Sequence, residues 1–191
     1  MVEADYDPRL VDERHDRFVM ISGCSGSGKS SLLEELAARG FDTCAEPGRQ
    51  IVKEQQSIGG DALPWANATQ FVALVISRAM HQMVTAARNA QRTFFDRGIV
   101  DAVTALERLD LPVPAHYRTA LHRYRYNRKV FLSPPWPEIF CNDGERRHPF
   151  EEAAAECTAL EAAYACHGYD IVLLPKLAVA ARADFILAQL A

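Results

Sequence analysis

A run of small residues followed by a lysine and two serines lies near the start of the chain. Glycine stands at positions 23, 26 and 28, and Lys29 and Ser30 complete the pattern G-x-x-x-x-G-K-S. Glycines allow successive backbone N–H groups to point at one anion, and the N-terminus of a following helix adds a positive dipole end. Since this pattern arises by chance in roughly one chain of this length in a hundred, it predicts a binding site for the phosphates of a nucleoside triphosphate.

The side chains of this segment, a P-loop, predict how ATP and Mg²⁺ are held. Lys29 is expected to be an exposed point charge that reaches the β- and γ-phosphates, and the Ser30 hydroxyl is expected to ligate Mg²⁺. Cys24 stands near a helix N-terminus, where a thiol pKa can fall, but a small residue that fits the loop is the simpler interpretation. The residues predicted to contact the nucleotide are Gly23, Cys24, Ser25, Gly26, Ser27, Gly28, Lys29, Ser30 and Ser31.

An aspartate and an arginine follow the apolar run Thr93-Phe94-Phe95, the predicted third strand. An aspartate at the end of a strand beside the P-loop strand can hold Mg²⁺, directly or through water. An adjacent arginine can meet a phosphate with two hydrogen bonds. We therefore place Asp96 at the metal and Arg97 in the catalytic site, with an ordinary surface turn as the alternative.

A glutamate follows the predicted second strand, in the sequence Ala45-Glu46-Pro47-Gly48-Arg49. Ligands of doubly wound sheets bind outside the carboxyl ends of the strands. Glu46 is thus expected where it can orient or deprotonate the hydroxyl group of an acceptor molecule. A simple turn is the alternative interpretation of these residues.

The elements that must position these residues alternate along the chain. Apolar periodicity between five short apolar runs predicts amphipathic helices, the longest over about residues 67–89. This alternation predicts an α/β fold of the P-loop NTPase type, with a five-stranded parallel sheet and helices on both faces. The expected strands are about residues 18–22, 41–45, 93–96, 130–132 and 171–174.

The size of the chain indicates one domain. With 191 residues, 49% of them hydrophobic, the chain can build one core but not two. Residues 1–16 are polar and are expected to form a tail before a domain over residues 17–191. A loop rich in proline and charge, about residues 134–149, is expected to form a small lid.

Composition narrows the classes of function. The net charge of −4 argues against a nucleic-acid partner, and no apolar run reaches the roughly 20 residues of a membrane span. The acidic N-terminus does not resemble a signal peptide, and the five cysteines form no C-x-x-C pair. These features predict a cytoplasmic protein without disulfides. A switch GTPase is not expected, because Asn127-Arg128-Lys129-Val130 lacks the aspartate of the guanine-reading N-K-x-D motif. An AAA+ machine is not expected either, because the chain has no room for the helical lid domain.

Two further features keep two interpretations each. Basic residues alternate with Tyr117, Tyr124 and Tyr126 over residues 116–129, which would suit an anionic substrate or RNA, although a charged helix face with packed tyrosines is the simpler reading. Trp65 and Trp136 lie in predicted loops, where each can border the acceptor pocket or serve as a packing anchor.

Taken together, these motifs resemble those of the P-loop nucleoside and nucleotide kinases. Thymidylate kinases carry an Arg-Ala-x-His-like run before a strand that ends in Asp-Arg, similar to residues 77–81 and 95–97 here. Glu46-Pro47-Gly48 is similar to the Glu-Pro-Gly of the same enzymes, and deoxynucleoside kinases use a glutamate there as base. The chain also resembles a group of bacterial P-loop proteins identified as ATPases or nucleotide kinases, similar to the ribosylnicotinamide kinase domain.

The resemblance implies roles for arginines on the acceptor side. Arg78 would contact the base or phosphate of the acceptor, and Arg97 would bind the acceptor or the transferring phosphoryl group. Arg146 and Arg147 would be lid arginines that close over the phosphates, with a solvated charge pair as the alternative. Arg49 is also expected at the substrate, although it replaces a glycine of the thymidylate kinase loop, so thymidylate itself is not implied. The adenine pocket would involve the loop at residues 175–177.

The sequence therefore predicts a kinase that uses ATP and Mg²⁺ to phosphorylate a small acceptor, a nucleoside, a nucleotide or a riboside. The alternative is a nucleotide-dependent switch that hydrolyses ATP slowly and acts through a protein partner. In that case the polar N-terminal segment and the tyrosine-rich segment would be contact surfaces.

Overall fold

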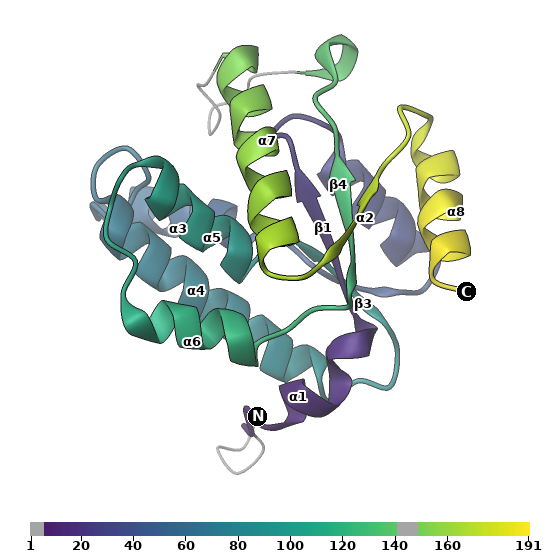
Figure 1. Cartoon of the computed structure of the whole chain (residues 1–191), viewed down its shortest axis with the longest axis horizontal. Coiled ribbons are helices and arrows are strands. Elements are labelled where there is room, and N and C mark those ends of the chain that lie inside the picture. The colour runs from purple at the N-terminus through teal and green to yellow at the C-terminus, as the bar shows by residue number, and fades with distance from the viewer. Residues whose placement is uncertain (1–5, 141–148) are drawn as a thin grey trace.

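The computed structural model describes residues 6–140 and 149–191 of the chain. Its described strands form one parallel sheet in the order β2-β3-β1-β4-β5, which confirms the expected α/β fold (Figure 1). The strands are β1 (Phe18–Gly23), β2 (Asp42–Cys44), β3 (Thr93–Asp96), β4 (Lys129–Ser133) and β5 (Asp170–Leu173). The helices are α1 (Leu10–Arg14), α2 (Lys29–Ala38), α3 (Pro47–Ile58), α4 (Ala68–Ala86), α5 (Ile99–Arg108), α6 (Ala115–Arg123), α7 (Phe150–Cys166) and α8 (Val179–Gln189), with 3₁₀ turns η2 (His15–Arg17) and η3 (Pro137–Ile139).

The central strand β1 fixes the position of the P-loop and of the residues beside it. All six of its residues are buried, as expected for a strand covered on both faces. Ile21 pairs with Asp96 of β3, and Gly23 pairs with Ser133 of β4. Because all these strands run parallel, their carboxyl ends meet at one edge of the sheet. The P-loop, Asp96 and the loop after β4 therefore share that edge.

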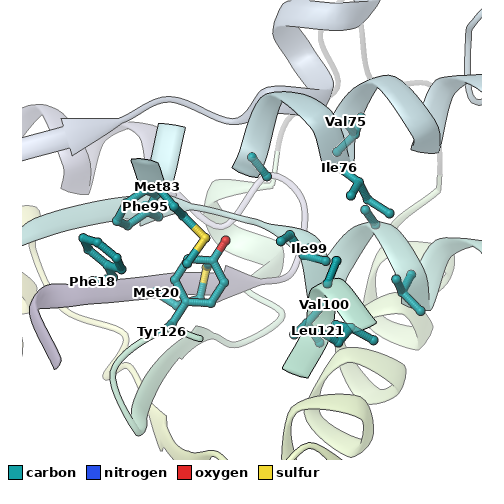
Figure 2. Packing of buried hydrophobic residues seen from close by; sticks show 14 of the residues in the cluster. Phe18, Met20, Val75, Ile76, Met83, Phe95, Ile99, Val100, Leu121 and Tyr126 are labelled. Atoms are coloured by element: carbon teal, nitrogen blue, oxygen red, sulfur yellow. The ribbon is translucent and has the colours of Figure 1, made fainter. Parts of the chain in front are cut away.

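Helices cover both faces of the sheet. Alternate side chains of β1 point to opposite faces, so Phe18 and Met20 enter one core while Val19 and Ile21 enter the other. The larger core packs against α1 and against the helices from α3 to α7, and the smaller one against α2 and α8 (Figure 1). Figure 2 shows the larger core, where Phe18 meets Phe95 edge to face with ring centroids 5.5 Å apart.

The segment that was expected to be a polar tail is partly folded. Residues 10–14 form helix α1, and Val11, only 1% exposed, lies in the larger core against α4. Tyr6 stacks on His81 of α4, with ring centroids 5.7 Å apart. The sequence pattern missed this helix because two apolar residues among many charges give no visible periodicity.

The tyrosine-rich segment mainly serves packing. Tyr117 and Tyr126 are 7% and 2% exposed, and Tyr126 packs edge to face on Phe95 in the core of Figure 2. Arg125 lies over the ring of Tyr169, 4.0 Å from its centroid. This agrees with the simpler of the two interpretations. None of the helices in the described part of the chain combines the length and apolar character needed to cross a membrane.

Candidate nucleotide and acceptor site

The P-loop owes its shape to glycines at three positions. Gly23, Gly26 and Gly28 have positive φ angles of 108°, 73° and 75°, which favour glycine. At Gly23 a side chain would also collide with the backbone of Ser133 in β4. Directly after Gly28, helix α2 begins at Lys29. The backbone N–H groups at this helix N-terminus therefore face the edge of the sheet where β1 and β3 end.

The expectation that Lys29 is exposed is wrong. Lys29 is 5% exposed, and its Nζ atom donates hydrogen bonds to the carbonyl oxygens of Cys24, at 2.8 Å, and Gly23, at 3.3 Å. The loop folds around the ammonium group, so the charge lies inside its curve rather than in solvent. Burial and the nearby Arg97 lower the pKa of Lys29, while Asp96 and Glu46 oppose this shift.

Cys24 occupies the loop as a small apolar residue. It is fully buried and packs with Ala153 and Cys157 of α7. Burial raises the pKa of its thiol to about 11, so the helix N-terminus does not activate it. Ser27 is also buried, and its hydroxyl donates to the carbonyl oxygen of Cys24 at 2.6 Å. Cys24 and Ser27 were predicted to contact the nucleotide, but their side chains are buried and stabilise the loop itself.

An open cavity of about 770 Å³ lies on the α2 side of the P-loop and is the candidate donor cavity. Five of the predicted nucleotide contacts line it, and so do residues that follow β4 and β5. The loop expected to hold adenine contributes Lys176 and Leu177. The P-loop residues that line it are Gly26, Gly28, Lys29, Ser30 and Ser31.

Arg182 of α8 closes one side of the donor cavity and was not found from the sequence. It is 4% exposed and donates a hydrogen bond to the carbonyl oxygen of Ser27 at 3.1 Å. Its guanidinium carbon lies 5.5 Å from the centroid of the Trp136 ring, which lines the same cavity. Trp65, by contrast, is 59% exposed and lines neither of the two cavities described here. No local pattern marks an arginine near the end of the chain as part of this site.

Asp96 lies at the end of β3, beside the strand that leads into the P-loop. The residue is 3% exposed, and among the described residues its Oδ1 atom has no hydrogen-bond partner. Burial raises the pKa of Asp96 to about 6, although Lys29 opposes the rise. Ser30 is exposed and lines the donor cavity. A buried carboxylate oxygen and a hydroxyl at one sheet edge fit a hard cation such as Mg²⁺.

Arg97 connects the P-loop to α7. Its Nη1 and Nη2 atoms bind Glu156 at 2.6 and 3.2 Å, and Nη2 also donates to the carbonyl oxygen of Gly23 at 3.1 Å. Its Nε atom lies 3.8 Å from Glu46. Arg97 adopts a left-handed backbone with φ of 57°, a conformation that is costly outside glycine and that recurs at functional sites. The sequence indicated Arg97 but not Glu156.

Asp101 is a second buried carboxylate that the sequence did not reveal as a site residue. It accepts hydrogen bonds from Ser22 Oγ, from the Gly98 N–H at 2.9 Å and from the Tyr164 hydroxyl at 2.6 Å. An acid at the third position of a helix after glycine is a capping pattern that could have indicated it. At Gly98 itself, a side chain would collide with Tyr126, which explains why no aromatic residue follows Asp96-Arg97 here.

A second cavity, of about 400 Å³, lies on the other side of the P-loop and is the candidate acceptor cavity. Phe71, Val72 and Val75 of α4 form part of an apolar wall, and Ser25 of the P-loop lines it as well. Glu46 and Arg49 contribute to its polar side and form an ion pair at 3.1 Å. Volumes of roughly 300–1,000 Å³ are typical of sites for small molecules.

Among the described residues, the predicted acceptor arginine Arg78 does not join this cavity. Arg78 of α4 binds Glu54 at 2.9 Å and Gln50 at 3.2 Å on α3, and it is not among the residues that line either cavity. The prediction that Arg78 contacts the acceptor therefore has no support in the geometry. Arg146 and Arg147, and most of the expected lid, lie outside the described residues.

A P-loop after the central strand, flanked by β3 and β4 in a parallel sheet, defines a P-loop NTPase fold. A family model described as "AAA domain" matches residues 18–182, and the chain belongs to this family. A search of curated proteins finds no match.

Three solved structures share the fold, which is that of P-loop kinases, at 18% sequence identity or less. The NadR protein in complex with NR matches with a TM-score of 0.70 and 18% identity over 95% of this chain and 53% of its own. Deoxyadenosine kinase from M. mycoides with bound dATP gives 0.62 and 16%, over 91% and 98% of the two chains. Shikimate kinase from Acinetobacter baumannii in complex with shikimate gives 0.54 and 14%, over 90% and 91%. The chain thus spans about half the length of NadR.

Proposed function

We propose that this protein is a kinase that transfers the γ-phosphoryl group of ATP to a small acceptor, a nucleoside or a nucleotide. The observation that carries the proposal is the pair of cavities on the two sides of one P-loop. Gly26, Lys29 and Ser30 line the donor cavity, Ser25 lines the acceptor cavity, and Arg49 lines both. Transfer between two bound molecules needs two adjoining sites, whereas hydrolysis needs one.

On the donor side, the backbone of the P-loop would bind the triphosphate and Lys29 would supply positive charge. The lysine already lies inside the loop, held by two carbonyl oxygens, so little reorganisation is needed when phosphate oxygens replace them. Ser30 and Asp96 would hold Mg²⁺. The metal, when bound, would neutralise charge on the phosphates as the phosphoryl group departs.

On the acceptor side, Glu46 would orient the acceptor hydroxyl and take up its proton. Glu46 lines the acceptor cavity and lies 3.8 Å from Arg97, which in turn contacts the P-loop at Gly23. These contacts support a base at Glu46 and a positive charge at Arg97 next to the segment that would carry the phosphates. The apolar wall formed by Phe71, Val72 and Val75 would keep water away from the transferring group.

ADP release measured with and without candidate acceptors tests this proposal. The panel contains ribonucleosides, deoxyribonucleosides, nicotinamide riboside and shikimate, because the neighbours in the fold bind compounds of these kinds. We expect ADP release to rise at least about tenfold with a suitable acceptor, and mass spectrometry should detect the phosphorylated product. Slow ADP release that no acceptor changes would contradict a kinase and favour a nucleotide-dependent switch that acts through a protein partner.

A further inference from the structure

Carboxylates surround the positive charge of Arg97, which lines the acceptor cavity. Glu156 binds the Arg97 guanidinium with two hydrogen bonds, of 2.6 and 3.2 Å. Asp101 lies 3.7 Å from its Nη1 atom, and Glu46 lies 3.8 Å from its Nε atom. The Nη2 atom of Arg97 also donates a hydrogen bond to the carbonyl oxygen of Gly23 at 3.1 Å. Each nitrogen of this arginine therefore already faces an oxygen of the protein.

The other charged residues of the cavity leave its formal charge negative. The second arginine on its polar side, Arg49, pairs with Glu46 through its Nε atom at 3.1 Å. Four carboxylates and three arginines line the cavity among the described residues, so their formal charge is negative. These residues are Glu46, Asp101, Glu152, Glu156, Arg49, Arg97 and Arg108.

Glu156 is ionised at neutral pH in this arrangement. Burial alone would raise the pKa of its carboxyl group, but the charge and hydrogen bonds of Arg97 outweigh burial, and the pKa is lowered. The Glu156 side chain is 24% exposed and belongs to α7, whereas Arg97 follows β3. This ion pair therefore joins α7 to the turn after β3.

A phosphorylated acceptor would meet this cavity unfavourably. A phosphate dianion is usually recognised by arginines whose donors are free to bind it in pairs. Here it would have to displace Glu156 and lie among carboxylates, and such like-charge contacts are a common way for a site to reject a ligand. An uncharged hydroxyl group faces neither obstacle, since it can donate a hydrogen bond to Glu46.

We propose that the acceptor is an unphosphorylated ring compound that carries a hydroxyl group, and that Glu156 is the positioning residue that excludes phosphorylated acceptors. This inference rests on the proposed kinase function. Glu156 acts through Arg97, whose charge it neutralises and whose donors it occupies. The ring of the acceptor packs on the wall formed by Phe71, Val72 and Val75.

The first test compares acceptors on the unaltered protein. Each nucleoside and nicotinamide riboside is assayed beside its own 5′-monophosphate, and kcat/KM is measured for both. We expect a preference of at least about 100-fold for the unphosphorylated member of the active pair. A monophosphate used equally well would overturn the inference and leave the kinase standing, whereas no turnover with any compound would overturn the proposed function itself.

The second test removes the charge of Glu156. In Glu156→Gln we expect Arg97 to gain a free charge, so that kcat/KM for the monophosphate rises about tenfold relative to the nucleoside. Glu156→Asp keeps the charge and should keep the preference. Glu161→Gln removes a charge from an exposed position on the same helix and should change nothing.

Two measurements keep this result independent of folding. Thermal melting shows whether each variant is folded, and calorimetry measures binding of the nucleoside monophosphate without turnover. The inference requires that the monophosphate bind Glu156→Gln more tightly than the unaltered protein, and that its affinity rise relative to that of the nucleoside. An equal preference in Glu156→Gln and the unaltered protein would show that Glu156 plays no part in acceptor selection.

Discussion

The donor and acceptor sides of this site are built in different ways. The phosphate-binding part of the donor side is one contiguous segment, residues 23–31, in which glycines shape the backbone and α2 begins with its N–H groups facing the site. The acceptor side draws its residues from α3, α4, α5 and α7 and from the turn after β3. Backbone recognition suits the triphosphate, which every such protein binds, while side chains from many elements can adapt to one particular acceptor.

The two sides also treat charge differently. On the donor side, Lys29 lies inside a loop of carbonyl oxygens, where its charge remains available to an anionic ligand. On the acceptor side, the Arg97 charge is matched by Glu156 and flanked by Glu46 and Asp101. A single sheet edge thus offers one place suited to highly charged phosphates and one suited to a neutral molecule.

The largest expected effect concerns Lys29. Lys29→Ala should lower kcat by a factor on the order of 10³ to 10⁵, as for other cations that contact a phosphoryl transition state, and should weaken ATP binding. Because Lys29 is buried, Lys29→Met, which keeps most of the side-chain volume, should show the same loss. Calorimetry with ATP and thermal melting separate loss of binding from loss of fold. Unchanged ATP affinity in both variants would remove the P-loop from the donor site.

Glu46→Gln tests the acceptor side. The substitution keeps the size of the side chain but removes its basic charge, so we expect kcat to fall by about 10² to 10⁴ with a hydroxyl acceptor. The affinity for ATP should stay within about twofold, because Glu46 lines the acceptor cavity and not the donor cavity. Steady-state kinetics and calorimetry give the two quantities. A fully active Gln variant would rule out Glu46 as the base.

The sequence predicted contiguous segments well, and it missed residues that reach the site from distant helices. The parallel sheet and most helix positions follow from apolar periodicity, and the P-loop follows from a contiguous motif. Asp96, Arg97 and Glu46 could be placed at the site because the carboxyl ends of parallel strands meet at one edge. Arg182 and Glu156 could not, since they enter from helices near the end of the chain through long-range contacts. The geometry does not support the prediction for Arg78, because its spacing from Asp96 along the chain could not reveal the ion pair with Glu54.

Asp96→Asn should separate stability from activity. The pKa of Asp96 rises from 3.8 to about 6 on folding, so the folded protein binds more protons between those values and loses stability as the pH rises through them. Above about pH 6 the carboxylate is ionised, and the folded state bears the full free-energy cost of burying its charge. The variant should therefore be more stable than the unaltered protein at pH 7 by on the order of 1–3 kcal/mol, while Mg²⁺-dependent turnover is lost.

Chemical denaturation at pH 4 and pH 7 measures this difference in stability. The two proteins should differ little at pH 4 and most at pH 7. Asp61→Asn, at an exposed position, controls for the general effect of losing a negative charge. Equal stability at pH 7 would contradict the raised pKa of Asp96, and normal turnover in Asp96→Asn would place the residue outside the metal site.

The smallest expected effects come from one aromatic residue on each side. Trp136 lines the donor cavity, and Phe71 lines the acceptor cavity. Loss of stacking on a base is worth about 1–3 kcal/mol, so Trp136→Ala should raise the KM for ATP by about tenfold and leave the KM for the acceptor unchanged. Phe71→Ala should do the reverse, because it removes apolar surface from the acceptor wall alone. If either variant shifted both KM values together, the two cavities would not be separate sites, and the contrast between a backbone-built donor side and a side-chain-built acceptor side would fail.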